Sequence, residues 1–223
     1  MPQFLYYPTK PNTLIQGFAA NPAYYARFLD KAGNPLKGHM GLDFVAAHGT
    51  PLYAVCDGLA FYATDDHGGD GIYINATPAT GGRFYVINWH LCSKDDPHYK
   101  PLIPTDGSWT PVKAGQLIGY TDNTGAPFES SGDHLHLGLM PLSAQGAILQ
   151  PSNGFGGCVD PTPYFNGKYA ADITNPPAPI PSMPPLSTSD QIAVLAAQKL
   201  AAGQTAQANT LFALAKFLKA FGY

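Results

Sequence analysis

Two short stretches of the chain carry residues whose types and spacing suit metal binding. His39 and Asp43 are four residues apart, and His134 and His136 are two residues apart. Glycines and β-favouring residues surround both pairs, so each stretch is expected to be extended, and residues i, i+2 and i+4 of a strand share one face. If the two strands are neighbours, three imidazoles and one carboxylate meet on one patch of a sheet. Such nitrogen and oxygen ligands bind a transition metal, with zinc the best match.

The composition indicates the kind of fold that must position these residues. The 223 residues are 45% hydrophobic and 12% charged, and they include 24 glycines and 22 prolines. The 13 tyrosines and 12 phenylalanines favour strands over helices. We therefore expect a mainly β protein, in which an antiparallel sheet with long loops forms one full-sized domain over residues 1–170.

Charge and hydropathy patterns exclude several classes of function. The formal net charge is −3 and no basic stripe is present, which argues against nucleic acid and against a polybasic membrane contact. The first residues lack the features of a signal peptide. The apolar stretch Leu211–Phe221 contains Lys216 and Lys219 and is too short to cross a bilayer. We expect neither a signal peptide nor a membrane span in this chain.

The cysteines and the remaining histidines show no metal-binding spacing. The three cysteines allow one disulfide with a free thiol, or three buried apolar side chains, and the second alternative is favoured. Three histidines lie in polar, turn-like surroundings and are interpreted as incidental. These cysteines and histidines are Cys56, Cys92, Cys158, His48, His67 and His98.

Local patterns predict several elements around the two motifs. Residues 1–37 look irregular, with one strand at Thr13–Phe18 and a short helix near Ala23–Leu29. Two hairpins are expected further along the chain. The first joins 52–55 to 59–63 across Asp57-Gly58, a strong turn signal, and the second joins 71–77 to 83–90 across Thr80-Gly81-Gly82.

The C-terminal part differs in composition from the domain. Residues 171–188 are rich in proline and favour a semi-rigid polyproline II linker. Residues 189–223 predict an amphipathic α-helix whose apolar stripe needs a partner. Self-association is favoured, while docking onto the domain or binding another protein stays open.

Several ordered motifs together resemble the lysostaphin-type (LytM-domain) zinc endopeptidases. Each motif is weak alone, but the set keeps its order and its intervals over residues 14–165. The motifs are Gly38-His39-Met40-Gly41-Leu42-Asp43-Phe44, Gly49-Thr50-Pro51-Leu52, Asp57-Gly58, Trp89-His90-Leu91, Val112-Lys113-Ala114-Gly115-Gln116-Leu117-Ile118-Gly119, Asn123-Thr124-Gly125 and Gly132-Asp133-His134-Leu135-His136-Leu137.

The resemblance implies a role for each polar residue of the site. His39, Asp43 and His136 match the family's zinc ligands, which implies one Zn²⁺ per chain. His90 and His134 match catalytic histidines that stay off the metal. A catalytic zinc with three protein ligands keeps its fourth position for water or substrate, which agrees with this division.

The resemblance also implies a substrate, namely peptides of bacterial peptidoglycan cut within the stem or the cross-bridge. Three loops, over residues 65–70, 95–109 and 122–131, are expected to wall the groove that binds them. Two residues depart from the family pattern: Asn88 stands where a tyrosine is frequent, and Asp133 where a proline is frequent. The residues expected to contact substrate are Asn88, Trp89, Asn123, Thr124 and Asp133.

The sequence thus predicts a zinc metallo-endopeptidase with a linker and an assembly helix, an arrangement that suits a cell-wall-opening component of a phage virion or tail. An exported wall-remodelling enzyme is the other setting. The alternative function is a catalytically silent regulatory or structural assembly protein of the same fold. All five polar site positions are intact in the sequence, which favours the active enzyme.

Overall fold

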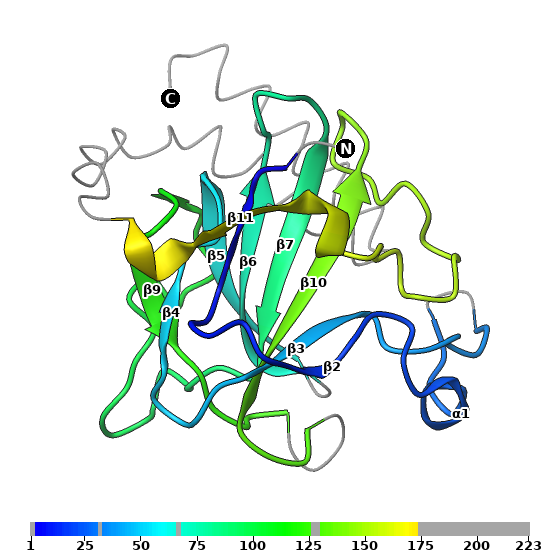
Figure 1. The fold of residues 1–223 in the computed structure, drawn as a ribbon, viewed down its shortest axis with the longest axis horizontal. Helices are drawn as coiled ribbons and strands as arrows, with labels where there is room; N and C mark the ends of the chain where they lie inside the picture. The colour runs from blue at the N-terminus through cyan, green and yellow to red at the C-terminus, as the bar shows by residue number, and fades with distance from the viewer. Residues whose placement is uncertain (1–2, 31–32, 66–67, 126–129, 174–223) are drawn as a thin grey trace, which may run out of the picture. The chain divides into compact units, whose positions relative to one another are not determined.

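The computed structural model describes residues 3–30, 33–65, 68–125 and 130–173, and this part of the chain is mainly β (Figure 1). The predicted fold class is confirmed. The helical segments are α1 (Pro22–Tyr25) and two 3-10 turns, Thr162–Tyr164 and Ala170–Asp172. The strands are β1 (Leu5–Tyr7), β2 (Leu14–Gln16), β3 (Gly41–Val45), β4 (Pro51–Tyr53), β5 (Gly58–Asp65), β6 (Gly69–Ala76), β7 (Arg83–Trp89), β8 (Thr110–Val112), β9 (Leu117–Tyr120), β10 (His134–Leu142) and β11 (Phe165–Tyr169).

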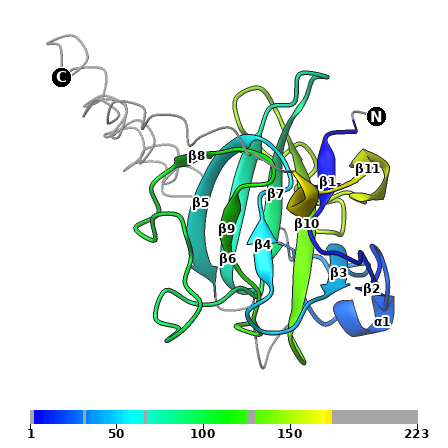
Figure 2. The same ribbon diagram turned by 60° about the vertical axis from the view of Figure 1, so that its left-hand side comes forward.

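Seven strands form the main antiparallel sheet, in the order β2-β3-β10-β7-β6-β5-β8. Two small sheets, β4–β9 and β1–β11, lie over one face of it (Figures 1 and 2). Leu52 of β4, Ile118 of β9 and Phe165 of β11 belong to the same buried core as Leu137 of β10. That face of the main sheet is therefore the core face, and polar side chains that alternate with core residues point to the other face.

The two motif strands are neighbours, as the site requires. β3 and β10 pair antiparallel, with Asp43 opposite His136 and Leu42 opposite Leu137. Leu42 and Leu137 are buried in the core. Because side chains alternate along a strand, Asp43 and His136 share the opposite face, and the register places them side by side.

The hairpin predicted across Asp57-Gly58 is wrong. β4 pairs with β9, whereas β5 pairs with β6 and β8. The Asp57 carboxylate accepts hydrogen bonds from Ala114 N at 2.9 Å and Lys113 Nζ at 2.7 Å. A Cβ at Gly58 would lie 2.6 Å from the carbonyl oxygen of Asn75. Asp57 therefore holds the loop at Lys113 and Ala114, and Gly58 lets β5 lie close to Asn75 of β6. The local turn signal in the sequence does not reveal either contact.

The second predicted hairpin is confirmed. β6 and β7 pair antiparallel up to Ala76 and Phe84. Gly81 and Gly82 in the turn have φ of 96° and 87°, a left-handed conformation that glycine adopts without steric cost.

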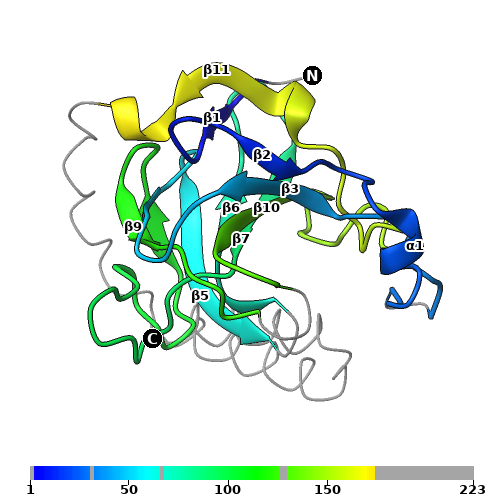
Figure 3. The same ribbon diagram turned by 60° about the horizontal axis from the view of Figure 1, so that its bottom comes forward.

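The N-terminal elements exist but are shorter than predicted. β2 occupies the middle of the expected strand, and α1 covers only the beginning of the expected helix. The helix stops because the chain turns back on itself: Leu36 N bonds to Phe28 O at 2.9 Å and Asp30 N to Asn34 O at 2.8 Å. Figure 3 shows α1 between β2 and β3 along the chain, on the side of the sheet away from β9.

Other sequence predictions concern the cysteines and the C-terminal part. All three cysteines are free and buried, which confirms the favoured alternative. The proline-rich linker after residue 173 and the helix over residues 189–223 lie outside the described residues. Within the described ranges, no helix has the length and apolar character needed to cross a membrane.

Candidate metal centre

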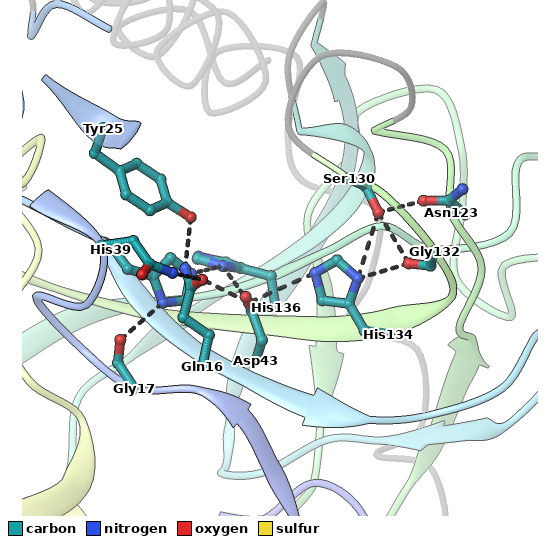
Figure 4. Close-up of polar contacts among 11 residues, drawn as sticks. Gln16, Gly17, Tyr25, His39, Asp43, Asn123, Ser130, Gly132, His134 and His136 are labelled. Atoms are coloured by element: carbon teal, nitrogen blue, oxygen red, sulfur yellow. Dashed lines mark hydrogen bonds and ion pairs between the residues drawn. The ribbon is translucent and has the colours of Figure 1, made fainter. Parts of the chain in front are cut away.

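His39, Asp43 and His136 bring one ligand atom each to a single buried point (Figure 4). His39 Nε2 lies 2.9 Å from His136 Nδ1 and 3.1 Å from Asp43 Oδ1. His136 Nδ1 lies 3.0 Å from the same carboxylate oxygen. Asp43 comes from β3 and His136 from β10, while His39 lies two residues before β3. Three donor atoms from separate parts of the chain thus form one triangle.

Backbone contacts fix the position and orientation of His39. Its N–H bonds to Ala20 O at 2.9 Å, and its carbonyl oxygen accepts the N–H of Ala19 at 2.9 Å. Its ring nitrogen Nδ1 lies 3.1 Å from the carbonyl oxygen of Gly17. The ring donates Nδ1–H to this carbonyl, so the Nε2 lone pair faces the triangle, and such an outer contact is usual for a metal-ligating histidine.

The His136 ring lies between Trp89 and the backbone of β3. The Trp89 ring stacks on it with centroids 5.2 Å apart and planes at 25°. On the β3 side, a Cβ at Gly41 would lie 2.7 Å from His136 Nε2 and 2.4 Å from the carbonyl oxygen of Leu137. Only a residue without a side chain leaves room for the ring at this register position.

The donor triangle fits a zinc ion. Tetrahedral zinc with bonds of about 2.0–2.1 Å separates its ligand atoms by roughly 3.3 Å. The three separations here, 2.9–3.1 Å, are close to that value. Burial by itself would raise the pKa of Asp43, but contacts with His136 and His39 hold it well below its usual range. Burial lowers the pKa of His136 despite the opposing effect of Asp43. The carboxylate is therefore ionised and His136 neutral, which are the forms that bind a metal.

His134 and His90 lie beside the triangle. His134 Nε2 is 3.6 Å from Asp43 Oδ1, and its Nδ1 is 2.8 Å from Gly132 O. Figure 4 shows His134 with Asp43 on one side and Gly132 with Ser130 on the other. The rings of His90 and His134 have centroids 4.6 Å apart. The structure thus brings together all five residues that the sequence singled out for metal binding and catalysis.

His90 has an unusual backbone and an unusual environment. It directly follows β7 with φ of 63°, a left-handed conformation that is uncommon for a residue with a side chain. It is buried, and no described residue forms a hydrogen bond with its Nδ1. Burial, followed by the proximity of His136 and His134, lowers the pKa of His90 to about 3. The imidazole is therefore neutral at physiological pH.

The five residues predicted to contact substrate have different positions. Trp89 lines the small cavity above the metal-binding triangle, and Asp133 lines the adjoining groove. Asn88 points to the core face, where its Nδ2 bonds to the carbonyl oxygen of Ile72 at 3.0 Å. Asn123 accepts a hydrogen bond from the Ser130 hydroxyl, and Thr124 Oγ1 donates to the carbonyl oxygen of Leu91 at 2.8 Å. The structure therefore brings Trp89 and Asp133 to the site, and it places the other three in supporting contacts.

The N-terminal segment supplies groove residues that sequence reasoning missed. The groove has a volume of about 530 Å³ and joins the metal-binding triangle at Asp43. One wall is formed by β2 and α1, and the other by the segment before β10. Of the loops expected as walls, only the end of 122–131 takes part among the described residues, and Trp109 instead packs on Phe61 and Tyr85. The lining residues are Ile15, Gln16, Asn21, Tyr24, Tyr25, Asp43, Ser130, Ser131, Gly132, Asp133 and His134.

A short polar network orders the first wall. Gln16 Nε2 donates to the Tyr25 hydroxyl at 2.7 Å, and Asn21 Nδ2 donates to Gln16 Oε1 at 2.7 Å. The Tyr25 ring lies 5.5 Å from the His39 ring. No spacing in the sequence identifies these three residues as part of the groove. Their position in the sequence, a short distance before His39, was the one available indication.

We expect Gly41→Ala to destabilise the protein and to weaken metal binding. The new methyl group would collide with the His136 ring and with the β10 backbone. Overpacking of this kind costs about 1–3 kcal/mol of unfolding free energy. Denaturant unfolding and zinc titration measure the two effects. Gly17→Ala is the matched control, because a Cβ there has nothing within 4 Å. Equal stability and zinc affinity in the two variants would contradict the expectation.

Comparisons with known proteins find a family model and a curated relative that match this chain. The model of peptidase family M23 matches residues 37–151. An uncharacterized metalloprotease of Haemophilus influenzae is 29% identical over 140 residues, which cover 59% of this chain and 26% of that protein. The chain thus spans about a quarter of the length of that curated relative.

Among solved structures, the chain is similar to two peptidases. The antimicrobial peptidase lysostaphin from Staphylococcus simulans is 23% identical, with 80% of this chain and 61% of that chain covered and a TM-score of 0.49. A zinc containing peptidase from Vibrio cholerae is 22% identical, with 78% and 41% covered and a TM-score of 0.45. The family model covers more than half of the 223 residues, including all five polar site positions. This protein belongs to peptidase family M23.

Proposed function

We propose that this protein is a zinc-dependent endopeptidase that cleaves stem or cross-bridge peptides of bacterial peptidoglycan. Family membership supports the metallopeptidase class. The observation that carries the proposal is the buried triangle of His39, Asp43 and His136 with His90 and His134 at its side. Three protein ligands leave a catalytic zinc one open position, and two histidines that are not needed as ligands remain available for proton transfer.

His39, Asp43 and His136 would hold the zinc ion. When bound, the ion supplies a Lewis acid that activates water and polarises the scissile carbonyl. His39 and Asp43 also connect the zinc site to the groove. Asp43 lines the groove, and the ring of His39 packs against Tyr25, which lines it as well.

His134 is the proposed general base. It donates Nδ1–H to Gly132 O at 2.8 Å, and this contact leaves the Nε2 lone pair directed at the metal-binding triangle. Nε2 takes the proton of the attacking water and delivers it to the leaving amine. His90 has the complementary role. It is neutral, and its N–H donates a hydrogen bond to the oxyanion that develops on the carbonyl.

The groove suits an extended peptide. It is open along one side, and β2 with α1 faces residues 130–134 across it. Its lining is mixed, with aromatic rings from Tyr24 and Tyr25 and polar groups from Gln16, Ser130 and Asp133. Flexible glycine- or D-alanine-containing peptides can lie in such an open channel.

We expect the zinc-loaded protein to release new fragments from purified peptidoglycan, and a zinc chelator to stop this release. Mass spectrometry of digests from defined peptidoglycans identifies the bond that is cut. Added zinc should restore the activity of the chelated protein, because His39, Asp43 and His136 would bind the ion again. Intact peptidoglycan after incubation with fully zinc-loaded protein would instead favour the catalytically silent alternative.

The biological setting is a further proposal that rests on the sequence. Residues 189–223 would attach the peptidase to a second copy or to a phage structural protein, and residues 171–188 would give it reach. A chain that ends at residue 173 should then hydrolyse peptidoglycan but show a smaller assembly size in solution than the full chain.

A further inference from the structure

A second cluster of metal-binding side chains lies beside the proposed catalytic histidines. It contains His48, Cys92, Asp96 and Asp122, and their ligand atoms all lie within 4.8 Å of one another. His48 is in the loop between β3 and β4, Cys92 and Asp96 follow β7, and Asp122 follows β9. Neither the sequence motifs nor the proposed peptidase mechanism uses this cluster.

The geometry of the cluster allows a cation to enter. His48 Nε2 lies 3.2 Å from Asp96 Oδ2 and 3.9 Å from Asp122 Oδ1. The His48 side chain is 40% exposed, so it can move by the small distance that coordination needs. Cys92 lies at the inner end, 1% exposed, and its thiol contacts the carbonyl oxygen of Thr121 at 3.2 Å. The site therefore has a buried sulfur at its base and an imidazole at its mouth.

The charges around His48 leave an excess of negative charge. Asp96 and Asp122 approach its ring, and Asp133 Oδ2 accepts its backbone N–H at 3.1 Å. Among the residues that the structure describes, no lysine or arginine forms an ion pair with any of the three carboxylates. Asp96 and Asp122 are partly buried, whereas Asp133 is exposed, and Asp96 Oδ1 already accepts the N–H groups of His98 and Tyr99. The Oδ2 atom of Asp96 and the carboxylate of Asp122 have no lysine or arginine partner among the described residues, and such partly buried carboxylates favour a bound cation.

We propose that His48, Cys92, Asp96 and Asp122 bind a second divalent transition cation of the zinc class. One nitrogen, one sulfur and two oxygen ligands suit zinc and cobalt, whereas magnesium and calcium prefer oxygen ligands alone. Binding converts the Cys92 thiol to a thiolate, with the sulfur–cation bond replacing the S–H bond and the proton leaving to solvent.

The position of this second site gives it a structural role. Asp122 N donates to the carbonyl oxygen of His90 at 2.7 Å, and the N–H of His134 approaches the carbonyl oxygen of Asp122 at 3.4 Å. Cys92 lies two residues after His90 in the chain. A cation held by Asp122 and Cys92 would therefore restrain the segment that follows His90 and the Asp122 backbone, which bonds to His90 and approaches His134.

Cobalt binding to the full chain tests the proposal, because only the second site contains sulfur. Titration of the metal-free protein with Co²⁺ should give two equivalents per chain and a near-ultraviolet thiolate-to-cobalt charge-transfer absorption. Cys92→Ser should lose this absorption and one equivalent. Cys56→Ser is the matched control, since Cys56 is equally buried and lies outside both sites, and it should keep both.

Two more variants separate this site from the first one. His136→Ala should lose one equivalent but keep the charge-transfer absorption, so failure of the proposed peptidase site does not affect the result. His48→Ala changes a side chain that is 40% exposed, and it should weaken the absorption at limiting cobalt even if Cys92→Ser fails to fold. One equivalent without charge-transfer absorption in the unaltered chain, or an absorption that persists in Cys92→Ser, would overturn the proposal.

Discussion

Replacing His136 with alanine is expected to remove zinc from the peptidase site and to reduce peptidoglycan hydrolysis to the uncatalysed background. His136 Nδ1 contacts both other ligand atoms, at 2.9 Å and 3.0 Å, so its loss opens the triangle and leaves only two protein ligands. Without the ion, neither water nor carbonyl is activated, and the rate should fall by several orders of magnitude.

Elemental analysis measures the zinc content of this variant, and digestion of purified peptidoglycan measures its activity. His98→Ala is the matched control, because His98 is an exposed histidine outside both metal-binding clusters. It should retain zinc and activity. A His136→Ala protein that digests peptidoglycan at the unaltered rate would refute the assignment of His136 as a ligand.

Replacing His90 with asparagine is expected to abolish most activity while leaving the metal in place. Asparagine tolerates the left-handed backbone at this position, where φ is 63°, better than most other residues do. It lacks an imidazole, so stabilisation of the developing oxyanion and any proton transfer by His90 are lost. Removal of such a group lowers kcat by about 10²- to 10⁴-fold.

The zinc content of this variant tests whether His90 acts in catalysis or serves as a metal ligand. His90→Asn should bind zinc as tightly as the unaltered chain, with kcat reduced and KM changed little. His134→Ala should behave in the same way. If either variant loses zinc in proportion to activity, that histidine belongs to the metal site and not to the proton-transfer machinery.

The main sheet and the donor triangle show which features of the structure local sequence patterns can predict. The i, i+2 spacing predicted that His134 and His136 share a face of one strand, and the pairing of β3 with β10 placed Asp43 opposite His136. The i, i+4 spacing placed His39 on the strand of Asp43, but His39 lies before β3, and backbone contacts with Ala19 and Ala20 position it instead. The same kind of local reasoning failed at Asp57-Gly58. The dipeptide has the composition of a tight turn, but β4 and β5 each pair with other strands. Turn chemistry reports conformation over a few residues and does not identify long-range strand partners.

Other parts of the site correspond to no pattern in the sequence that could have predicted them. Gly17 orients His39 through a backbone carbonyl, a group that every residue possesses. Tyr25 and Gln16 line the groove because β2 pairs with the edge of β3 and α1 follows it, and a three-residue strand leaves little periodicity in the sequence. The cluster at His48 draws on three loops, so no interval within one stretch of the chain could have predicted it.

The sequence by itself determined the types of donor group in this protein, the strand faces that carry Asp43, His134 and His136, and the peptidase family whose motifs it resembles. Only the tertiary structure decided which atoms meet. It joined Nε2 of His39 and Nδ1 of His136 at one carboxylate oxygen, brought Nδ1 of His134 within 2.8 Å of the carbonyl oxygen of Gly132, and gathered the second cluster at His48. The physical reason is that alternation along a strand is a local property of the backbone. Ring orientation and ligand convergence depend instead on contacts between residues that are far apart in the chain.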